Sequence, residues 1–332
     1  ADNRTAEKAE REPEPLADLL QELEQTDDGL EGTGYMGDDL DELLDDLGRI
    51  PGGEVDDPGA ETSRAEELQE EWGTELGQLW QIGRHRLLCG NSTDEADVER
   101  LLDGEEVVFG ITSPPYNAGS RGEEMSGNQA MPEEKYEGDF DDDMTAEEYS
   151  ALLNESTQNA LDHCRWFCIN LQMIARNKRS VIEYLHNWRS HIADIAVWHK
   201  TNARPACPRR VMDSAFEWLV ILSSERDPTR AIGTRDFRGE VQNVYSSPSN
   251  GGKNEWSDVH AAAFPVGLPK WIFESFTTQS DLVFDPFGGT GTTIIAAEKT
   301  NRIARMVELE PGYCAVILQR CSEAGMECEL IE

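Results

Sequence analysis

The feature that most constrains this fold is an apolar run that leads into a glycine-rich turn and a helical pattern. Residues 282–293 read LVFDPFGGTGTT, and the pattern IIAAEKTNR follows them. The three glycines allow a sharp turn and a close approach of the backbone to a ligand, and the helix offers its N-terminal N–H groups. The turn lacks a P-loop lysine and the Gly-x-Gly-x-x-Gly spacing, which favours a nucleoside-bearing cofactor without a pyrophosphate. An ordinary strand-to-helix turn is the alternative for this segment alone.

Strand-like and helical patterns alternate from residue 85 onward. The predicted strands lie at 107–112, 166–171 and 194–200, and the predicted helices at 97–102, 145–163 and 177–188. This alternation predicts an α/β fold, with a mainly parallel Rossmann-like sheet and helices on both faces. Ligand sites then lie at the carboxyl ends of the strands. Glu308 ends a further predicted strand and can accept hydrogen bonds from ribose hydroxyls there; a surface glutamate is the plain alternative.

A second motif, TSPPYN at residues 112–117, follows the strand at 107–112 directly. Its two prolines stop the strand and remove two backbone donors, so nearby carbonyls are free to accept hydrogen bonds from a ligand. Ser113 adds a hydroxyl acceptor and Tyr116 adds an aromatic face. A planar base with an exocyclic amine needs both kinds of group. A strand-ending turn without a ligand explains the motif equally well when it is taken alone.

Together the two segments resemble the DNA amino-methyltransferases, which methylate cytosine N4 or adenine N6 with S-adenosylmethionine. TSPPY resembles the catalytic motif of this family, and DPFGGTGTT resembles its cofactor loop. The loop follows the catalytic motif by about 170 residues, which resembles the motif order of the beta group. The resemblance covers roughly residues 76–325, because further similar segments follow one another in order at 79–94, 198–202, 215–225, 260–277 and 302–320.

The resemblance implies a role for each matching residue. In the catalytic motif, which comprises Ser113, Pro114, Pro115 and Tyr116, Ser113 and a carbonyl near Pro114 would accept the two amine hydrogens, and Tyr116 would stack on a flipped base. The implied cofactor contacts are Asn91, Phe264, Pro265, Asp285, Phe287, Gly288, Gly289, Gly291, Thr292 and Glu308. Asn91 stands where the family usually has aspartate, so its role is open.

Serine at position 113 resembles the cytosine-N4 enzymes, and we therefore expect a site-specific DNA methyltransferase acting on cytosine N4. Three alternatives stay open: an adenine-N6 enzyme, a decayed site that still binds cofactor or DNA, and an enzyme acting on RNA or protein. The intact motifs argue against decay. A partner nuclease, as in restriction–modification, is a further expectation.

Charge is distributed unevenly along the chain. The 332 residues include 66 acidic and 29 basic side chains, for a net charge of −37, and arginine outnumbers lysine. This composition resembles proteins of halophilic archaea or their viruses, in which high salt screens the repulsion of DNA phosphates. Residues 163–238 nevertheless hold 13 basic and 7 acidic side chains. We expect the DNA-facing residues there to be Arg176, Lys178, Arg179, Lys200, Arg204, Arg209 and Arg210.

The chain divides by composition into an extension and a catalytic domain. Residues 1–75, with 26 acidic and 5 basic side chains, are predicted to form short amphipathic helices or to be partly disordered. We expect the methyltransferase domain at 76–332, with 201–258 as the target-recognition region and 118–145 as a loop over the DNA or base. The opening ADNRTAE resembles the tail of ParB-like domains, so an upstream ParB-like domain is also expected.

Membrane and metal functions have no support in the sequence. No apolar run reaches the roughly 18 residues of a membrane span, and the seven cysteines show no zinc-ligand spacing. We therefore expect a cytoplasmic protein with reduced thiols and no metal.

Overall fold

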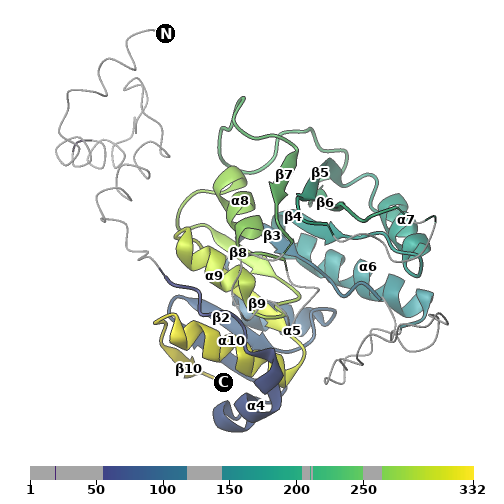
Figure 1. Cartoon of the computed structure of the whole chain (residues 1–332). Coiled ribbons are helices and arrows are strands. Elements are labelled where there is room, and N and C mark those ends of the chain that lie inside the picture. Colours follow the sequence, from purple (N-terminus) through teal and green to yellow (C-terminus); the bar gives the residue numbers. More distant parts are fainter. Residues whose placement is uncertain (1–18, 20–54, 118–143, 204–209, 211, 250–263) are drawn as a thin grey trace. The chain divides into compact units, whose positions relative to one another are not determined.

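The computed structural model describes residues 19, 55–117, 144–203, 210, 212–249 and 264–332 (Figure 1). The chain divides into two units, Ala1–Glu54 and Val55–Glu332, and the second unit contains nearly all of the described residues. Within the described residues, no helix combines the length and the apolar character needed to cross a bilayer.

A ten-stranded mixed sheet forms the centre of the second unit. In spatial order its strands are β10 (Cys328–Leu330), β1 (Leu79–Ile82), β2 (His85–Cys89), β9 (Ile303–Glu308), β8 (Leu282–Asp285), β3 (Val107–Thr112), β4 (Cys164–Leu171), β6 (Phe216–Ser223), β5 (Ile192–Lys200) and β7 (Val244–Ser247). The five central strands β2, β9, β8, β3 and β4 are all parallel. Their carboxyl ends therefore meet at one edge of the sheet, as the predicted α/β fold requires.

The flanking strands include antiparallel pairs. Strand β1 is antiparallel to both β2 and β10, and β6 is antiparallel to both β4 and β5. In the register of β6, Trp218 pairs with Leu171 of β4, and Glu217 pairs with Trp198 of β5. The beginning of β6 thus lies beside the ends of β4 and β5, at the same edge as the two motifs.

Helices cover both faces of the sheet (Figure 1). They are α4 (Ala65–Trp72), α5 (Glu95–Leu102), α6 (Ala146–His163), α7 (Lys178–Asn187), α8 (Gly267–Phe276), α9 (Thr292–Lys299) and α10 (Pro311–Glu323), with a short 3-10 turn η1 (Thr62–Arg64) before α4. Buried residues of α8, α9 and α10 share one core cluster with Trp166 and Cys168 of β4. Buried residues of α5, α6 and α7 share the other with Phe167 and Ile169. Alternate residues of β4 therefore face opposite layers.

The predicted helix at 145–163 is confirmed, and its start has a local cause. Thr145 Oγ1 accepts a hydrogen bond from Glu148 N (3.2 Å), and Glu148 Oε2 accepts one from Thr145 N (2.8 Å). This capping box satisfies two backbone donors at the first turn of α6. Tyr149, Leu153 and Ala160 then place fully buried side chains on its inner face.

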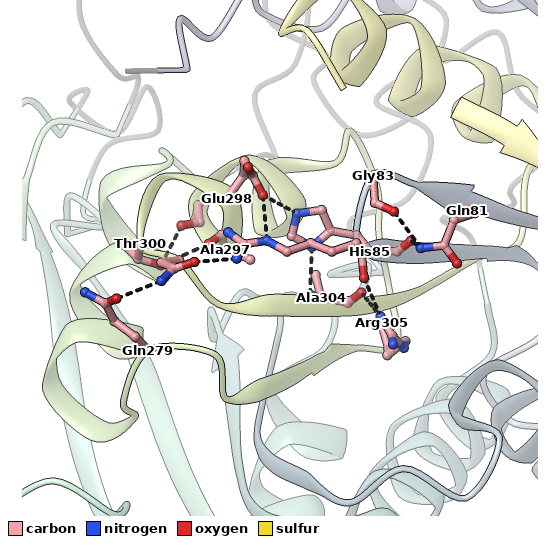
Figure 2. A network of polar contacts seen from close by, with 12 residues as sticks. Gln81, Gly83, His85, Gln279, Ala297, Glu298, Thr300, Ala304 and Arg305 are labelled. Atoms are coloured by element: carbon pink, nitrogen blue, oxygen red, sulfur yellow. Dashed lines mark hydrogen bonds and ion pairs between the residues drawn. The ribbon is translucent and has the colours of Figure 1, made fainter. Parts of the chain in front are cut away.

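A buried histidine fixes the helix that begins at the glycine turn. His85 Nδ1 accepts from Ala304 N (2.8 Å), so the ring carries its proton on Nε2, which lies 2.8 Å from Glu298 Oε2 of α9. Arg84 Nε also donates to Glu298 Oε2, at 3.0 Å. Burial lowers the pKa of His85 and keeps the ring neutral. Figure 2 shows how this network joins β2, the C-terminal part of α9, and β9.

The compact unit begins at Val55, twenty-one residues before the expected start at 76. Leu68 of α4 is fully buried and clusters with Ala315 and Val316 of α10. Asp57 forms a two-pronged ion pair with Arg320 of α10, at 2.8 and 2.7 Å. The high acidic content of residues 1–75 concealed the few side chains that attach 55–75 to the domain.

The region assigned to target recognition, 201–258, contains an interior strand. Strand β6 lies between β4 and β5, and its Leu219, Val220 and Leu222 are fully buried. This part of the region therefore belongs to the sheet. Residues 204–209, 211 and 250–258 lie outside the described residues, as does most of the expected loop at 118–145.

Candidate active site

Asp285, at the end of β8, joins the two predicted motifs. Its Oδ1 accepts from Thr112 Oγ1 at 2.6 Å and from Phe287 N at 3.0 Å, and its Oδ2 accepts from Thr293 Oγ1. The side chain is 1% exposed, and burial raises its pKa to about 6. We expected Asp285 to contact the cofactor. In the structure it holds strand β3, the glycine turn and the start of α9 together, because its oxygens accept from one donor in each; its contact with the cofactor stays a prediction.

The glycine turn is packed on one side and open on the other. Gly288 N donates to Val307 O at 2.8 Å, and a Cβ at Gly288 would lie 2.6 Å from Met306 Sδ. Gly291, with φ +80°, lies against Ile317. Gly289 has φ +53°, and a Cβ added there would meet nothing within 4 Å. The turn thus leaves room for a ligand at Gly289.

Glu308, at the end of β9, braces this turn. Its Oε2 accepts from Gly289 N at 2.6 Å, and its Oε1 accepts from Glu310 N at 3.0 Å. Burial raises the pKa of Glu308 to about 7, against the two backbone hydrogen bonds that lower it. A carboxylate has about four acceptor positions, so Glu308 can still accept from ribose hydroxyls while it holds the loop.

Of the remaining expected cofactor residues, Asn91 and Thr292 make contacts of another kind. Asn91 is exposed, and its Oδ1 accepts from Thr93 N (3.0 Å) and Thr93 Oγ1 (2.9 Å), which closes a local turn after β2. Thr292 is buried, and its Oγ1 accepts from Arg320 Nη1 at 3.3 Å. Asn91 thus holds the turn after β2, and Thr292 connects the start of α9 to α10.

Three expected cofactor residues carry rings near the start of α8 and the glycine turn. Phe264 is 9% exposed and belongs to the core cluster under α8. Pro265 and Phe287 are half-buried. Half-burial leaves part of each ring available to a ligand.

The catalytic motif enters a network of polar side chains that the sequence did not predict. Ser113 Oγ lies 3.0 Å from Tyr116 Oη, and Tyr116 Oη donates to Glu217 Oε2 at 2.8 Å. Lys200 Nζ forms an ion pair with the other carboxylate oxygen of Glu217. Asn170 Nδ2 donates to Glu217 Oε2 at 2.6 Å and to Tyr116 Oη at 3.1 Å. Strands β4, β5 and β6 and the segment that follows β3 thus supply one connected group.

Burial determines the protonation state of Tyr116 in this network. Glu217 is 3% exposed and Asn170 is 1% exposed, whereas Ser113, Pro115 and Tyr116 are half-buried and Pro114 is buried. Burial, together with the Glu217 carboxylate, raises the pKa of Tyr116 well above its ordinary value, so the hydroxyl keeps its proton. Asn170 Oδ1 is buried with no hydrogen-bond partner among the described residues. It is therefore an unused acceptor beside the motif.

Glu217 and Asn170 left only a faint signal in the sequence. Each is a polar residue next to the apolar stretch of a buried strand, FEWLVILS for β6 and CRWFCINL for β4. A buried strand position occupied by a carboxylate or an amide usually has a partner. The side-chain contacts of the structure show which partner it is.

The expected DNA-facing residues fall into three groups. Arg176, Lys178 and Arg179 are exposed around the start of α7, and Asn177 between them donates from Nδ2 to Tyr116 O at 2.8 Å. Arg210 is exposed too, while Arg204 and Arg209 lie outside the described residues. Lys200 differs from the expectation, because its side chain is 14% exposed and its ammonium is bound to Glu217.

Comparison with known proteins identifies the family of this chain. A model of the N6/N4 DNA methylase family matches residues 107–319, which include both motifs. This chain belongs to that family. Among its relatives is the type II methyltransferase M.XycI of Xanthomonas campestris pv. cyanopsidis, 28% identical over 37% of the chain and 42% of M.XycI. Another is M2.DpnII of Streptococcus pneumoniae, 23% identical over 65% of the chain and 81% of M2.DpnII.

The fold of this methylase-family chain also has a solved counterpart. The structure of the PvuII DNA methyltransferase (cytosine-N4-specific) superposes with a TM-score of 0.52 at 16% identity, over 76% of this chain and 91% of that one. This likeness concerns the fold.

The chain spans at most half the length of several curated relatives that it matches, including M.XycI at 42% and M2.MboI of Moraxella bovis at 50%.

Proposed function

We propose that this chain is a DNA methyltransferase that transfers a methyl group from S-adenosylmethionine to the exocyclic amine of a flipped base. One observation carries the proposal: Asp285 binds Thr112, next to Ser113, and also binds Phe287 and Thr293 on either side of the glycine turn. A methyl donor at the turn and an amine at Ser113 would therefore be neighbours. Holding two reactants in this way can supply an effective molarity of about 10⁵ to 10⁸ M.

The residues present fit the cofactor. The open side of Gly289 gives it room, and Glu308 has acceptor positions left for ribose hydroxyls. Phe287 and Pro265 offer half-buried rings to the adenosine. S-adenosylmethionine supplies a methyl group already activated by its sulfonium, so the work of the protein is to position the two reactants and to accept hydrogens.

The catalytic motif fits an amine. The Ser113 hydroxyl and a carbonyl near Pro114 would accept the two N–H groups, which frees the nitrogen lone pair from the ring and aims it at the methyl carbon. Tyr116 would stack on the base, an interaction of about 1–3 kcal/mol. Arg176, Lys178 and Arg179 lie on the segment that Asn177 ties to Tyr116, where they could bind the phosphates beside the flipped base.

Cytosine N4 is the proposed target, because serine opens the motif. Adenine N6 is the second candidate, since the same acceptors suit either amine. The acidic composition favours an enzyme that works at high salt. The proposed partner is double-stranded DNA.

Nucleoside mass spectrometry tests both the reaction and the base. The purified chain is incubated with S-adenosylmethionine and unmethylated duplex DNA in molar KCl, and the DNA is digested to nucleosides. We expect 4-methylcytosine. A 6-methyladenine peak would keep the reaction and change the base, whereas label found only in RNA or protein in parallel reactions would contradict the DNA assignment.

A further inference from the structure

We propose that Glu217 is a positioning residue for methyl transfer, which orients the Ser113 hydroxyl through Tyr116 and takes up the proton that the amine releases. The proposal rests on the function proposed above. It concerns a residue of β6, 101 positions from Tyr116 in the chain and outside the sequence motifs.

The direction of the hydrogen bonds that link Ser113, Tyr116 and Glu217 follows from the chemistry of the Glu217 carboxylate, the last group of the series. Glu217 is held by the Lys200 ammonium and by the Asn170 amide, which are both donors, so it is an acceptor-only carboxylate. Tyr116 must then donate its proton to Glu217. The Tyr116 oxygen is left to accept, and the nearby hydroxyl that can supply a proton is Ser113, at 3.0 Å.

This direction matters for the substrate. Once the Ser113 proton points to Tyr116, the Ser113 oxygen can only accept; Asn170 Nδ2 donates to it at 3.4 Å, and the other lone pair is available to an incoming amine. An amine N–H requires such an acceptor, whereas a Ser113 hydroxyl turned the other way would present its own hydrogen to the substrate. Glu217 therefore determines the direction of the hydrogen bonds in the motif without touching the base.

The same chain gives the proton an exit. As the amine nitrogen bonds to the methyl carbon, the carbon–sulfur bond breaks, its electron pair stays on sulfur, and the nitrogen holds one proton too many. That proton moves to Ser113 Oγ, the Ser113 proton moves to Tyr116 Oη, and the Tyr116 proton moves to Glu217 Oε2. Glu217 becomes a neutral acid, and the reverse transfers return the proton to water after the product leaves.

A purely structural ion pair would be an unusual use of this position. Removing two charges from water costs several kcal/mol per ion, and apolar replacements of buried pairs are often neutral or stabilising. Here the pair lies in the core, with Glu217 at 3% exposure and Lys200 at 14%, and the Lys200 ammonium also lies 5.0 Å from the centroid of the Trp198 ring. One member of the pair, Glu217, is hydrogen-bonded to the catalytic motif, where a fixed charge can act on the reaction.

Two substitutions interrupt the chain at different links. Glu217→Gln keeps the shape and removes the charge, and Tyr116→Phe keeps the ring and removes the hydroxyl. We expect each to lower kcat by about 10²-fold, the lower end of the usual range for proton transfer. The KM values for DNA and S-adenosylmethionine and the calorimetric Kd of the cofactor should stay within twofold. The double variant should be no slower than either single one, because both act on one chain.

Tyr184→Phe is the matched control. It removes another buried tyrosine hydroxyl, which lies 2.9 Å from Thr157 Oγ1 and is not hydrogen-bonded to the catalytic motif, and it should leave kcat unchanged. A wild-type kcat in Tyr116→Phe would overturn the proposal even if Glu217→Gln failed to fold, and so would multiplying effects in the double variant. Absence of any methylated nucleoside with the wild-type chain would instead overturn the proposed function.

Discussion

The two halves of the candidate site are held in place by different means. On the cofactor side, both carboxylates accept hydrogen bonds from backbone N–H groups close by in the chain. Glu308 accepts from Gly289 and Glu310, and Asp285 accepts from Phe287. On the catalytic side, Tyr116 meets Glu217 and Asn170, which are 101 and 54 residues away. The cofactor half is therefore encoded locally, and the catalytic half depends on the order of strands in the sheet.

We expect the largest loss of activity from a substitution in the catalytic half alone. Tyr116→Ala removes both the stacking ring and the hydroxyl that joins Ser113 to Glu217, so we expect kcat to fall by more than about 10³-fold. Cofactor binding, measured by calorimetry, should remain as in the wild type. Full turnover in this variant would remove Tyr116 from the mechanism, and loss of cofactor binding would show that the two halves are not separable.

A substitution at the joint should affect both halves. Asp285→Ala leaves Thr112, Thr293 and Phe287 N without their acceptor, and we expect the free energy of unfolding to fall by about 2–4 kcal/mol. Urea unfolding measures it. Asp281→Ala is the control, because Asp281 accepts from Thr278 in a more exposed turn, and it should cost about 1 kcal/mol or less. Equal losses in the two variants would contradict the role of Asp285 as a joint.

A third change addresses the cofactor half. Gly289→Ala places a methyl group in the open space beside the turn and should raise the Kd of S-adenosylmethionine by about tenfold or more. Gly83→Ala is closely matched, since Gly83 has φ +52° against +53° for Gly289 and equally open surroundings. Both should lose about 1–2 kcal/mol of stability from left-handed strain. Only the first should weaken binding; unchanged binding in Gly289→Ala would place the cofactor elsewhere.

A fourth effect concerns pH. Burial raises the pKa of Glu308 from its ordinary 4.5 to about 7, so the folded protein holds a proton that the unfolded chain releases across that window. The free energy of unfolding contributed by Glu308 should therefore fall as pH rises from 4.5 to 7. The wild type should lose more stability over this range than Glu308→Gln, measured by urea unfolding at a series of pH values. Parallel pH curves would contradict the prediction.

The sequence alone predicted the locally encoded features. The parallel centre of the sheet, the helix at 145–163 and the open turn at Gly289 depend on short-range periodicity, capping and glycine content, and each is visible within about twenty residues. Glu308 at the end of its strand is a feature of the same kind. The hydrogen bond by which Glu308 holds the glycine turn was harder to predict, because a sequence does not show which backbone N–H a carboxylate contacts.

The rest depended on pairings that no local pattern contains. Asp285 meets Thr112 across 173 residues, and Lys200 is neutralised by Glu217 of the neighbouring strand. A count of basic residues placed Lys200 among the DNA contacts, because charge composition does not show which cations already have a partner. Leu68 was hidden in the same way by the acidic residues around it.

The central claim is that the catalytic motif and the glycine turn form one methyl-transfer site. The most direct test is a transfer assay with labelled S-adenosylmethionine and duplex DNA, run on the wild type and on Ser113→Ala, with cofactor binding measured on both. We predict labelled 4-methylcytosine from the wild type, and a large loss of label in Ser113→Ala with an unchanged cofactor Kd. Equal label from both proteins, or no label in DNA from the wild type, would contradict the account.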